Sequence, residues 1–363
     1  MISNQTQLNI LENLWINGYS TVPELSRNLK IDRSNISRNA SYLYKKNYII
    51  KTDKKENNNL IGRKADIIRF NYGYKYTLGI YITESFILSC LMDLGLNIIS
   101  ENIKFINLRN EDTKKIIQEI LISTNKYTQY FKDLMSVSVA FPEATDSDTG
   151  TLIGNGLFQF ENFPLKEKLE KETGLYFHIE NDANAGAMYY LLDSKLKYKN
   201  LVFMLMGFFF HEDMIKGYQG NGIIINKKIY KGSNNLSGEQ SITTNLISNN
   251  QKIRYENFTD YLKSIKNPEI IFDDYLEKIS TIISTTANIL DPDVFVLGGY
   301  VHMLPNNIIN LIKNKTYEKI INYPNRKFKI IIDDTKLKSI VIGASGSFMN
   351  KLMKSFDFAK NFL

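Results

Sequence analysis

The sequence predicts a two-part α/β protein, with a winged helix-turn-helix domain over residues 1–72 and a two-lobed α/β domain over residues 73–363. The length of 363 residues fits two or three domains. Apolar residues make up 43% of the chain, which is enough to bury a sizeable core. Beyond residue 73, strand-like and helical runs alternate, as they do in layered α/β folds.

Composition excludes several classes of protein. The single cysteine, Cys90, rules out an intramolecular disulfide and a cysteine-based zinc cluster, and fits a reducing compartment. The longest apolar run, over residues 201–210, is too short to cross a bilayer. The first ten residues lack the basic segment of a secretory signal. We therefore expect a cytoplasmic protein that does not contact a membrane.

The positive charge is concentrated at the N-terminal end. Residues 1–75 hold 13 Lys or Arg and 6 Asp or Glu, which accounts for the whole net charge of +7. The remaining residues hold 32 of each sign. A local basic excess is typical of a domain that binds the phosphate backbone of nucleic acid. Charge alone leaves open a solvated basic surface without a partner.

Two short helices are predicted first. Apolar residues at helical spacing indicate a helix over residues 8–17 that stops at Gly18. Thr21 and Glu24 have the spacing of a capping box, in which each side chain bonds a backbone N–H of the first turn. Pro23 falls in that turn, where its missing N–H costs nothing.

A third helix has the pattern of a DNA-recognition helix. Asp32 is a good N-cap, and the apolar residues Ile36, Ala40 and Leu43 share one stripe. The outer side carries Arg, Asn and Ser, whose side chains pair with base edges in the major groove. The candidate DNA-binding residues on this helix are Arg33, Ser34, Asn35, Ser37 and Arg38.

Two strand-like runs, over residues 48–52 and 65–70, flank a polar and basic loop. This arrangement predicts a wing. Arg63 and Lys64 at its return are placed to reach phosphates or an adjacent minor groove. The alternative is a three-helix module that binds another protein. The local charge and the polar outer face favour DNA.

The remaining chain shows two series of strands and helices. In the first series, three strand-like runs over residues 76–105 precede a helix near 113–124 and a strand over 136–141. In the second, strand-like runs over residues 200–230 lead to helices, a strand at 293–299, a helix from Pro305, a strand at 327–333 and a helix after Gly343. Two similar series predict lobe one over 73–195 plus 343–363, lobe two over 196–342, and a ligand-binding cleft between them.

Four motifs in these series are distinctive. The most specific are "ENDANA" at 180–185 and "GNGIIINKKIYKGSNNLSGE" at 220–239. "DPDVFVLGG" at 291–299 and "VIGASGSFM" at 341–349 follow them. In this order the motifs resemble those of the ROK family (repressors, open reading frames and kinases), and specifically of its transcriptional-regulator branch. The resemblance implies an actin-like, ribonuclease-H-like pair of lobes.

The resemblance also implies that ATP binding has been lost. The family's kinases hold ATP phosphates on a turn with Asp, paired Gly and Thr, where glycine lets the backbone approach closely. Here residues 81–84 lack the Asp and the paired Gly, and Glu84 brings negative charge. Residues 205–222 carry bulky aromatic and acidic side chains where the kinases keep a Gly-Thr-Gly run. We therefore expect no catalytic residues and no cofactor; an ATP-dependent ROK sugar kinase is the alternative.

By the same resemblance, the candidate sugar-binding residues are Asn181, Asp182, Glu239 and Asn155. In the family's kinases the matching Asp is the general base that deprotonates the sugar hydroxyl. Helix capping is the alternative role for Asn181 and Asp182, and a surface turn for Glu239. No His follows Glu239 and the zinc motif is absent, so no metal is expected. His178 is predicted to be a core residue.

Together these features predict a sequence-specific transcriptional regulator, most simply a repressor, of carbohydrate uptake or catabolism genes. Its partners would be double-stranded DNA with a palindromic operator, a sugar or sugar phosphate effector, and a second copy in a homodimer or homotetramer. A regulator controlled by a protein partner, with a vestigial sugar cleft, is a further alternative.

Overall fold

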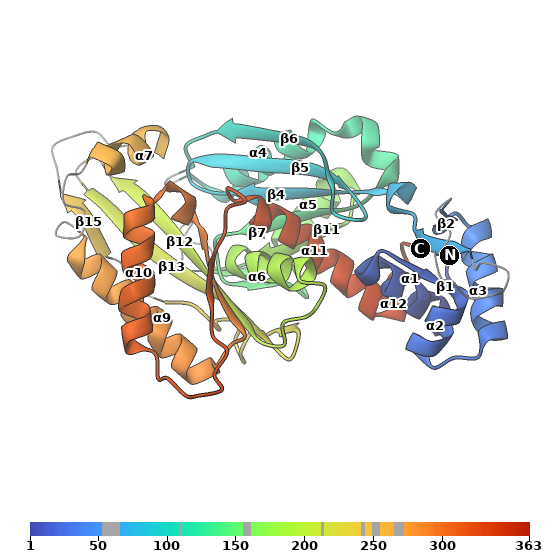
Figure 1. Cartoon of the computed structure of the whole chain (residues 1–363). Helices are drawn as coiled ribbons and strands as arrows, with labels where there is room; N and C mark the ends of the chain where they lie inside the picture. The colour runs from blue at the N-terminus through green and yellow to red at the C-terminus, as the bar shows by residue number, and fades with distance from the viewer. Residues whose placement is uncertain are drawn as a thin grey trace.

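The computed structural model describes residues 1–52, 66–108, 111–154, 161–211, 214–240, 244–248, 255–264 and 272–363. A small N-terminal unit lies at one end of an elongated molecule, and two larger sheets with their helices form the rest (Figure 1). Both chain termini lie in or beside the small unit, so its structure depends on both ends of the chain. In the described residues, no helix is long and apolar enough to cross a membrane.

The N-terminal unit, here called the head, comprises three helices and a three-stranded antiparallel sheet. The helices are α1 (Gln5–Asn17), α2 (Val22–Leu29) and α3 (Arg33–Lys45). The strands β1 (Tyr19–Thr21), β2 (Ile49–Lys51) and β3 (Ile67–Phe70) pair in the order β1-β3-β2. The three predicted helices and two predicted strands are confirmed, whereas β1 was not predicted because it is only three residues long.

The helix ends in the head follow the local signals in the sequence. Gly18 ends α1 with a φ of +85°, which favours glycine, and its N–H donates to the Leu14 carbonyl. Thr21 and Glu24 form the predicted capping box at the start of α2. The Asp32 carboxylate accepts the N–H of Ser34 at 2.9 Å and begins α3. These caps orient α3, whose outer side carries the candidate DNA-binding residues.

The first large sheet has the strand order β11-β7-β4-β5-β6. The predicted strands are present as β4 (Tyr76–Ile82), β5 (Phe86–Asp93), β6 (Ile98–Phe105) and β7 (Leu134–Phe141), and β11 (Phe177–Asn181) pairs parallel to β7. Helices α4 (Thr113–Asn125) and α5 (Leu165–Thr173) share an apolar core with one face of this sheet. Three short strands, β8 (Thr145–Asp146), β9 (Thr151–Gly154) and β10 (Glu161–Phe163), form a small side sheet.

The second large sheet contains the strand path β14-β13-β12-β16-β17, with β15 paired to β13. Its strands are β12 (Leu201–His211), β13 (Met214–Ile225), β14 (Lys228–Ile229), β15 (Thr244–Ser248), β16 (Val294–Gly299) and β17 (Ile330–Ile332). Helices α7 (Tyr255–Ser264), α9 (Asp273–Leu290) and α10 (Asn306–Lys319) accompany it. The long apolar run at 201–210 is therefore a strand, and residues 201–208 are buried, because β12 lies between β13 and β16.

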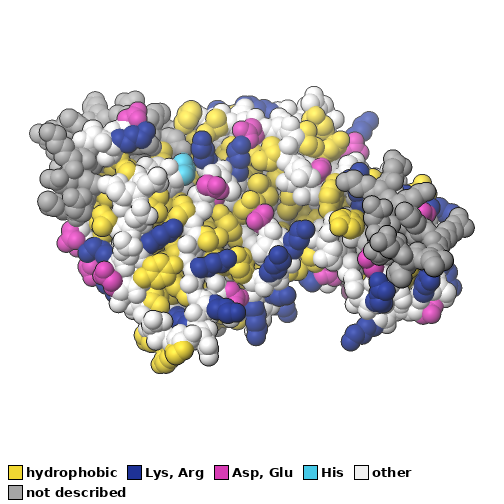
Figure 2. All heavy atoms as spheres, in the orientation of Figure 1, with side chains coloured by type: hydrophobic (Ala, Val, Ile, Leu, Met, Phe, Trp, Pro, Cys, Tyr) yellow, Lys and Arg dark blue, Asp and Glu magenta, His cyan; other side chains and the backbone are white. Residues whose placement is uncertain are grey.

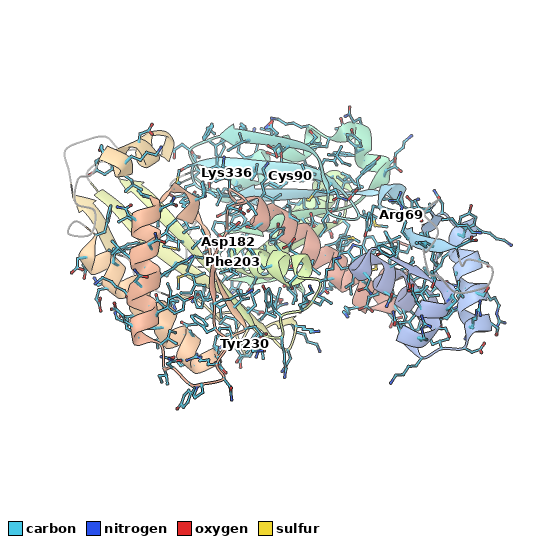
Figure 3. The ribbon with its side chains drawn as sticks, in the orientation of Figure 1. Arg69, Cys90, Asp182, Phe203, Tyr230 and Lys336 are labelled. Atoms are coloured by element: carbon cyan, nitrogen blue, oxygen red, sulfur yellow. The ribbon has the colours of Figure 1, made fainter. Side chains whose placement is uncertain are left out.

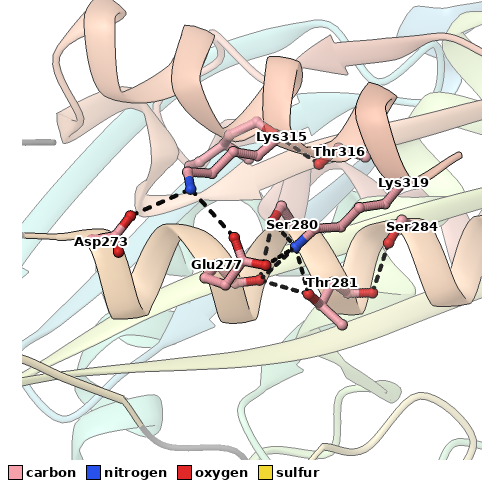
Figure 4. Close-up of polar contacts among 9 residues, drawn as sticks. Asp273, Glu277, Ser280, Thr281, Ser284, Lys315, Thr316 and Lys319 are labelled. Atoms are coloured by element: carbon pink, nitrogen blue, oxygen red, sulfur yellow. Dashed lines mark hydrogen bonds and ion pairs between the residues drawn. The ribbon is translucent and has the colours of Figure 1, made fainter.

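An exposed polar network joins α9 to α10 (Figure 4). The Glu277 carboxylate contacts the ammonium groups of both Lys315, at 3.3 Å, and Lys319. Asp273 pairs with Lys315 at 3.3 Å, and Lys319 also donates to the hydroxyl of Thr281 at 2.8 Å. These contacts hold the outer helix pair together at the surface, away from the cleft.

Two helices, α6 (Asp182–Asp193) and α11 (Lys338–Lys354), pack closely against each other. The predicted helix start after Gly343 was wrong: α11 begins five residues earlier, at Lys338. Gly343 lies within the helix. The position requires glycine because a Cβ there would sit 1.8 Å from the Ala185 carbonyl oxygen. The glycine therefore allows the backbones of α6 and α11 to approach, and it does not mark a helix end.

The C-terminal end of the chain completes the core of the head. Phe348, Leu352 and Met353 of α11 belong to the same buried cluster as Leu8 and Leu11 of α1. The last helix, α12 (Phe356–Ala359), adds Ala359 and is followed by Leu363, whose carbonyl accepts the Ile2 N–H at 2.7 Å. The head is thus packed on the end of α11, a helix that also borders α6.

Candidate DNA-binding surface and effector cleft

The outer side of α3 carries exposed polar and basic side chains. Arg33, Ser34, Ser37 and Arg38 are exposed, as their place on the helix predicts. Asn35 is half-buried, and its side-chain oxygen accepts a hydrogen bond from Asn39 Nδ2 at 2.6 Å. Figure 2 shows Lys and Arg side chains on the visible part of the head. Four of the five candidates on this helix are therefore directly accessible to a partner, and Asn35 is engaged within the helix.

A groove of about 710 Å³ lies between α3 and the edge of the head sheet. Lys51 on β2 forms an ion pair with Asp66 at 2.7 Å at this groove. Helical spacing from Arg33 would have identified the α3 members, whereas Lys51 and Asp66 meet only because β2 and β3 pair. The polar lining residues not singled out as binding candidates from the sequence are Ser41, Tyr44, Lys45, Lys51 and Asp66.

Three of the candidate residues lie outside the described residues. Arg63 and Lys64 on the predicted wing belong to the segment 53–65, and Asn155 belongs to 155–160. Their roles in DNA and sugar binding stay predictions from the sequence.

Asn181 and Asp182 lie where β11 ends and α6 begins. The Asn181 side-chain oxygen accepts the Asn184 N–H at 3.0 Å, so Asn181 is the N-cap of α6, and its Nδ2 donates to the Glu143 carbonyl at 3.2 Å. The capping role considered for Asn181 is confirmed. Asp182, labelled in Figure 3, is the first residue of the helix and lies near the positive end of its dipole.

The Asp182 carboxyl group is buried, with 5% of the residue exposed. Its Oδ1 accepts the Ala183 N–H at 2.8 Å and its Oδ2 accepts the Tyr81 hydroxyl at 3.3 Å. Burial, with the nearby carboxylates of Glu239 and Glu143, raises the pKa of Asp182 to about 7. At neutral pH this group is close to half-protonated, so it can both accept and donate hydrogen bonds, as a polyhydroxylated ligand requires.

Glu239 reaches this region from the second lobe. It forms an isolated bridge with Gly220 of β13, and its N–H donates to the Leu236 carbonyl at 3.3 Å. Solvent reaches the residue, yet the surrounding protein raises the pKa of its carboxyl above the ordinary value. The structure therefore brings together Asp182 and Glu239, two residues 57 positions apart that come from opposite lobes.

Aromatic side chains occupy the region next to Asp182. Tyr81 and Phe86 pack edge to face with ring centres 6.1 Å apart, and Phe208 stacks on Tyr300 at 6.2 Å. Phe86 also contacts Tyr300 at 6.4 Å, which links the two pairs across the lobes. We call Tyr81, Phe86, Phe208 and Tyr300 the aromatic cluster. Tyr81, Phe86 and Phe208 lie in or beside the two segments that lack the glycines expected from the family's kinases, and Tyr300 directly follows the glycine pair at 298–299.

The surviving glycine pair at the end of β16 is explained by packing. A Cβ on Gly298 would lie 2.1 Å from the Phe203 ring, and a Cβ on Gly299 would lie 2.5 Å from the Met206 carbonyl oxygen. Gly299 also has a φ of +72°, which L side chains rarely adopt. These contacts account for both glycines without a nucleotide.

Two buried titratable groups were not predicted as a pair. His178 is 4% exposed, as its predicted place in the core requires, and its Nε2 lies 3.9 Å from Glu180 Oε2. Burial lowers the pKa of His178 to about 3, helped by Lys351, Lys166 and Lys231, and burial raises the pKa of Glu180 to about 7. His178 is therefore neutral at physiological pH. Period-two alternation along β11 places both side chains on the face towards α11.

The structure is a mixed α/β protein in which the carboxyl groups of Asp182 and Glu239 lie near each other, and its basic head shares its core with the last helices. Residues 77–244 match the ROK family model, and the chain thus carries a ROK family domain. It is 23% identical over 258 residues to the xylose repressor of Staphylococcus xylosus, covering 70% of this chain and 65% of that protein. The match thus spans slightly less than two thirds of that relative's length.

Two solved structures share the fold. A ROK family transcriptional regulator, described as a homologue of the E. coli MLC protein, aligns with a TM-score of 0.72 and 13% identity over 95% of this chain and 97% of that one. A ROK family glucokinase from Streptomyces griseus, in complex with glucose and AMPPNP, aligns with a TM-score of 0.62 and 16% identity over 74% of this chain and 98% of that one. Only the alignment with the regulator is long enough to include most of the head. The relatives therefore support the repressor branch.

Proposed function

We propose that this protein is a sugar-responsive transcriptional repressor that binds operator DNA through a winged helix-turn-helix domain over residues 1–72. The domain over 73–363 would sense the effector. One observation carries the proposal: α11 packs against α6, which begins at Asp182, and the same helix supplies core residues of the head. A ligand that contacts Asp182 is therefore two packed helices away from the DNA-binding surface.

The DNA-binding role rests on the exposed face of α3 and the groove beside it. Arg33 and Arg38 would pair with guanine edges in the major groove, and Ser34, Asn35 and Ser37 would add shorter contacts. Arg63 and Lys64 on the wing would hold the flanking backbone. A homodimer or homotetramer would read a palindrome with half-sites about one or two helical turns apart.

The sugar-sensing role rests on the cleft carboxylates. Asp182 and Glu239 approach from opposite lobes, so a sugar that bonds both would favour the closed arrangement of the lobes; Asn181 and Asn155 are the further candidate contacts. A ligand shifts such an equilibrium only by binding one state more tightly, typically with a coupling of about 1–3 kcal/mol. Because the relatives include xylose repressors, D-xylose is the first sugar to test.

Loss of kinase activity is supported by the aromatic cluster. Kinases need open backbone at the phosphate loops, whereas Tyr81, Phe208 and Tyr300 bring bulky rings there. The Tyr81 hydroxyl also donates a hydrogen bond to Oδ2 of Asp182, the residue that matches the general base of the family's kinases. We expect no ATP-dependent phosphorylation of any sugar in a panel. Turnover that Asp182→Asn abolishes would overturn this part of the proposal in favour of a ROK kinase.

Selection of genomic fragments by the purified protein tests the DNA-binding role and identifies the regulated genes. We expect palindromic sites upstream of carbohydrate uptake or catabolism genes, with weaker binding in the presence of the effector. Lys64→Ala should lower the affinity for all duplexes about equally and flatten its salt dependence. Absence of duplex binding even at low salt would contradict the proposal.

Calorimetry with sugars and sugar phosphates tests the sensing role separately. We expect binding that Glu239→Gln weakens, since this change removes one carboxylate and keeps the size of the side chain. If the protein binds DNA but none of these compounds, control by a protein partner with a vestigial cleft replaces the sugar-sensing model.

A further inference from the structure

A pocket lies at the junction between the head and the larger domain, and neither Asp182 nor Glu239 lines it. Its volume is about 280 Å³, just below the ~300–1,000 Å³ range of small-molecule sites. The head contributes Trp15 and Ile16 from the end of α1, and the larger domain contributes the other walls. Those walls are Gly95, Leu96, Asn97, Tyr189, Leu192, Asp193, Leu196 and Ile342.

Two walls of this junction pocket are held in place by hydrogen bonds. The Asp93 carboxylate accepts the N–H groups of Gly95 at 2.8 Å and Asn97 at 3.0 Å, which fixes the turn between β5 and β6. The indole N–H of Trp15 donates to the Leu94 carbonyl at 2.8 Å. The indole ring and the turn are therefore preorganised before any ligand arrives.

The aromatic and acidic groups here favour a positive charge. Asp193, near the end of α6, is the only charged residue among those that line the pocket. Burial, with the nearby carboxylates of Asp193, Asp333 and Asp334, raises the pKa of Tyr189 to about 12. Lys195, two residues beyond Asp193, is exposed and is not a lining residue. This spot is thus acidic in a chain whose net charge is +7.

We propose that the junction pocket binds a small organic cation, such as a primary or quaternary ammonium compound, with its charged group beside Asp193 and against the rings of Trp15 and Tyr189. Aromatic faces attract ammonium groups, and partly buried sites strengthen the attraction. The apolar walls Leu192, Leu196 and Ile342 are half-buried, so they gain from contact with the carbon atoms of the ligand. A neutral sugar has no positive charge to pair with Asp193 and little apolar surface to pack against the apolar walls.

A ligand in this pocket would contact the head and the larger domain at once. The bound ligand would stabilise the observed packing of α1 beside α6 and α11, because the pocket exists only while those helices stay together. The site is chemically independent of DNA and sugar binding, so it can be tested and refuted without deciding the proposed function.

The test uses the full-length protein and the fluorescence of Trp15, the single tryptophan of the chain. Choline is titrated against its neutral isostere 3,3-dimethylbutan-1-ol at constant ionic strength. We expect a saturable change in Trp15 emission with choline and a weaker or absent change with the alcohol. Asp193→Asn should weaken choline binding by about two- to five-fold, as for a partly exposed ion pair. Asp260→Asn on α7 is the matched control, because Asp260 is also an exposed helical aspartate.

Three results would overturn the proposal. They are an emission that choline does not change in a saturable way, equal binding of the alcohol, or unchanged choline binding in the Asp193→Asn variant. Because Asp193 is exposed at the end of its helix, its replacement leaves the fold intact, which circular dichroism checks.

Discussion

The candidate DNA-binding residues of the head and the candidate sugar-binding residue Asp182 lie in opposite environments. In the head, Arg33, Ser37 and Arg38 are exposed and contribute nothing to the core. Asp182 and its neighbours on β11, Glu180 and His178, are each at most 5% exposed, and burial moves the pKa of all three. Exposed groups can be exchanged without cost to folding, whereas buried groups couple ligand binding to stability and to pH. The four predictions below test this difference.

The largest expected effect is on DNA binding by the head. Changing both Arg33 and Arg38 to Ala should weaken binding to a selected site by roughly 2–6 kcal/mol, because each removes one pairing with a base edge. The free energy of unfolding should not change, since both side chains are exposed. Electrophoretic mobility shifts measure the first quantity and urea unfolding the second. Lys278→Ala, an exposed change on α9 at the opposite end of the molecule from the head (Figure 1), is the control.

Normal recognition of the site by the double variant would show that α3 is not the recognition helix. A large loss of stability would show that the surface of the head is not separable from its core. Either result would contradict the view that the head carries its DNA-binding residues on an exposed surface that does not support folding.

The second prediction concerns the core that the head shares with the C-terminal helices. Phe348 is fully buried, with ring centres 5.3 Å from Phe362 and 5.7 Å from Tyr176. Phe348→Ala should lower the free energy of unfolding by about 3–5 kcal/mol, because it leaves a cavity between α11 and the rest of this core. Trp15 emission during urea unfolding reports on the head directly. Phe105→Ala is the control: this residue is 54% exposed, so the change should alter the free energy of unfolding by less than about 0.5 kcal/mol.

If the Trp15 transition stays at the wild-type urea concentration, the head folds without α11, and the proposed route from Asp182 to the DNA-binding surface fails. A shift of this transition together with the circular dichroism transition supports one cooperative unit.

Local interactions were predictable from the sequence because they join residues close together in the chain. The Thr21–Glu24 capping box and the Asp32 cap span two or three residues, and both were identified correctly. Side-chain type and spacing carry the whole signal in such cases. Most strands of the two large sheets were found for a similar reason, since they are apolar runs between turns, whereas β15 was not predicted.

Long-range contacts were not predictable in this way. Tyr81 and Asp182 are 101 residues apart, and nothing in either segment alone indicates that the tyrosine hydroxyl meets the carboxylate. Gly343 was misread because a glycine in a helical pattern usually marks an end, whereas here the Ala185 carbonyl of another helix requires it. The contribution of α11 and α12 to the head depends on the same kind of packing.

The third prediction concerns the buried carboxylate of the cleft. The pKa of Asp182 is about 7 in the folded protein and near 3.8 in the unfolded chain, so the unfolded state loses its proton first. The free energy of unfolding of the wild type therefore falls as the pH rises between these two values, because the folded protein still holds a proton that the unfolded chain has lost. Asp182→Asn keeps the neutral form at every pH. Its free energy of unfolding relative to the wild type should rise from pH 4 to pH 8, by at most about 1.4 kcal/mol per pH unit.

Urea unfolding at pH 5, 6.5 and 8 measures this difference. His178 works in the opposite direction, because its lowered pKa removes stability as the pH falls below about 6.5, but it contributes equally to both proteins and cancels. If the difference in free energy of unfolding between variant and wild type does not depend on pH, Asp182 is ionised throughout this range. Burial would then not raise its pKa, and the contrast with the exposed residues of the head would disappear.

The smallest expected effect comes from the exposed network on α9 and α10. Glu277 bonds Lys315 and Lys319, and these contacts lower the pKa of its carboxyl group. Water screens them, so Glu277→Gln should lower the Tm by no more than about 2 °C despite the number of contacts in Figure 4. Differential scanning calorimetry at low and high salt measures the change, with Asp260→Asn as a control that removes a single weak ion pair. A drop as large as that of Phe348→Ala would mean that exposed polar groups also support the fold, and accessibility would then no longer separate the head from the cleft.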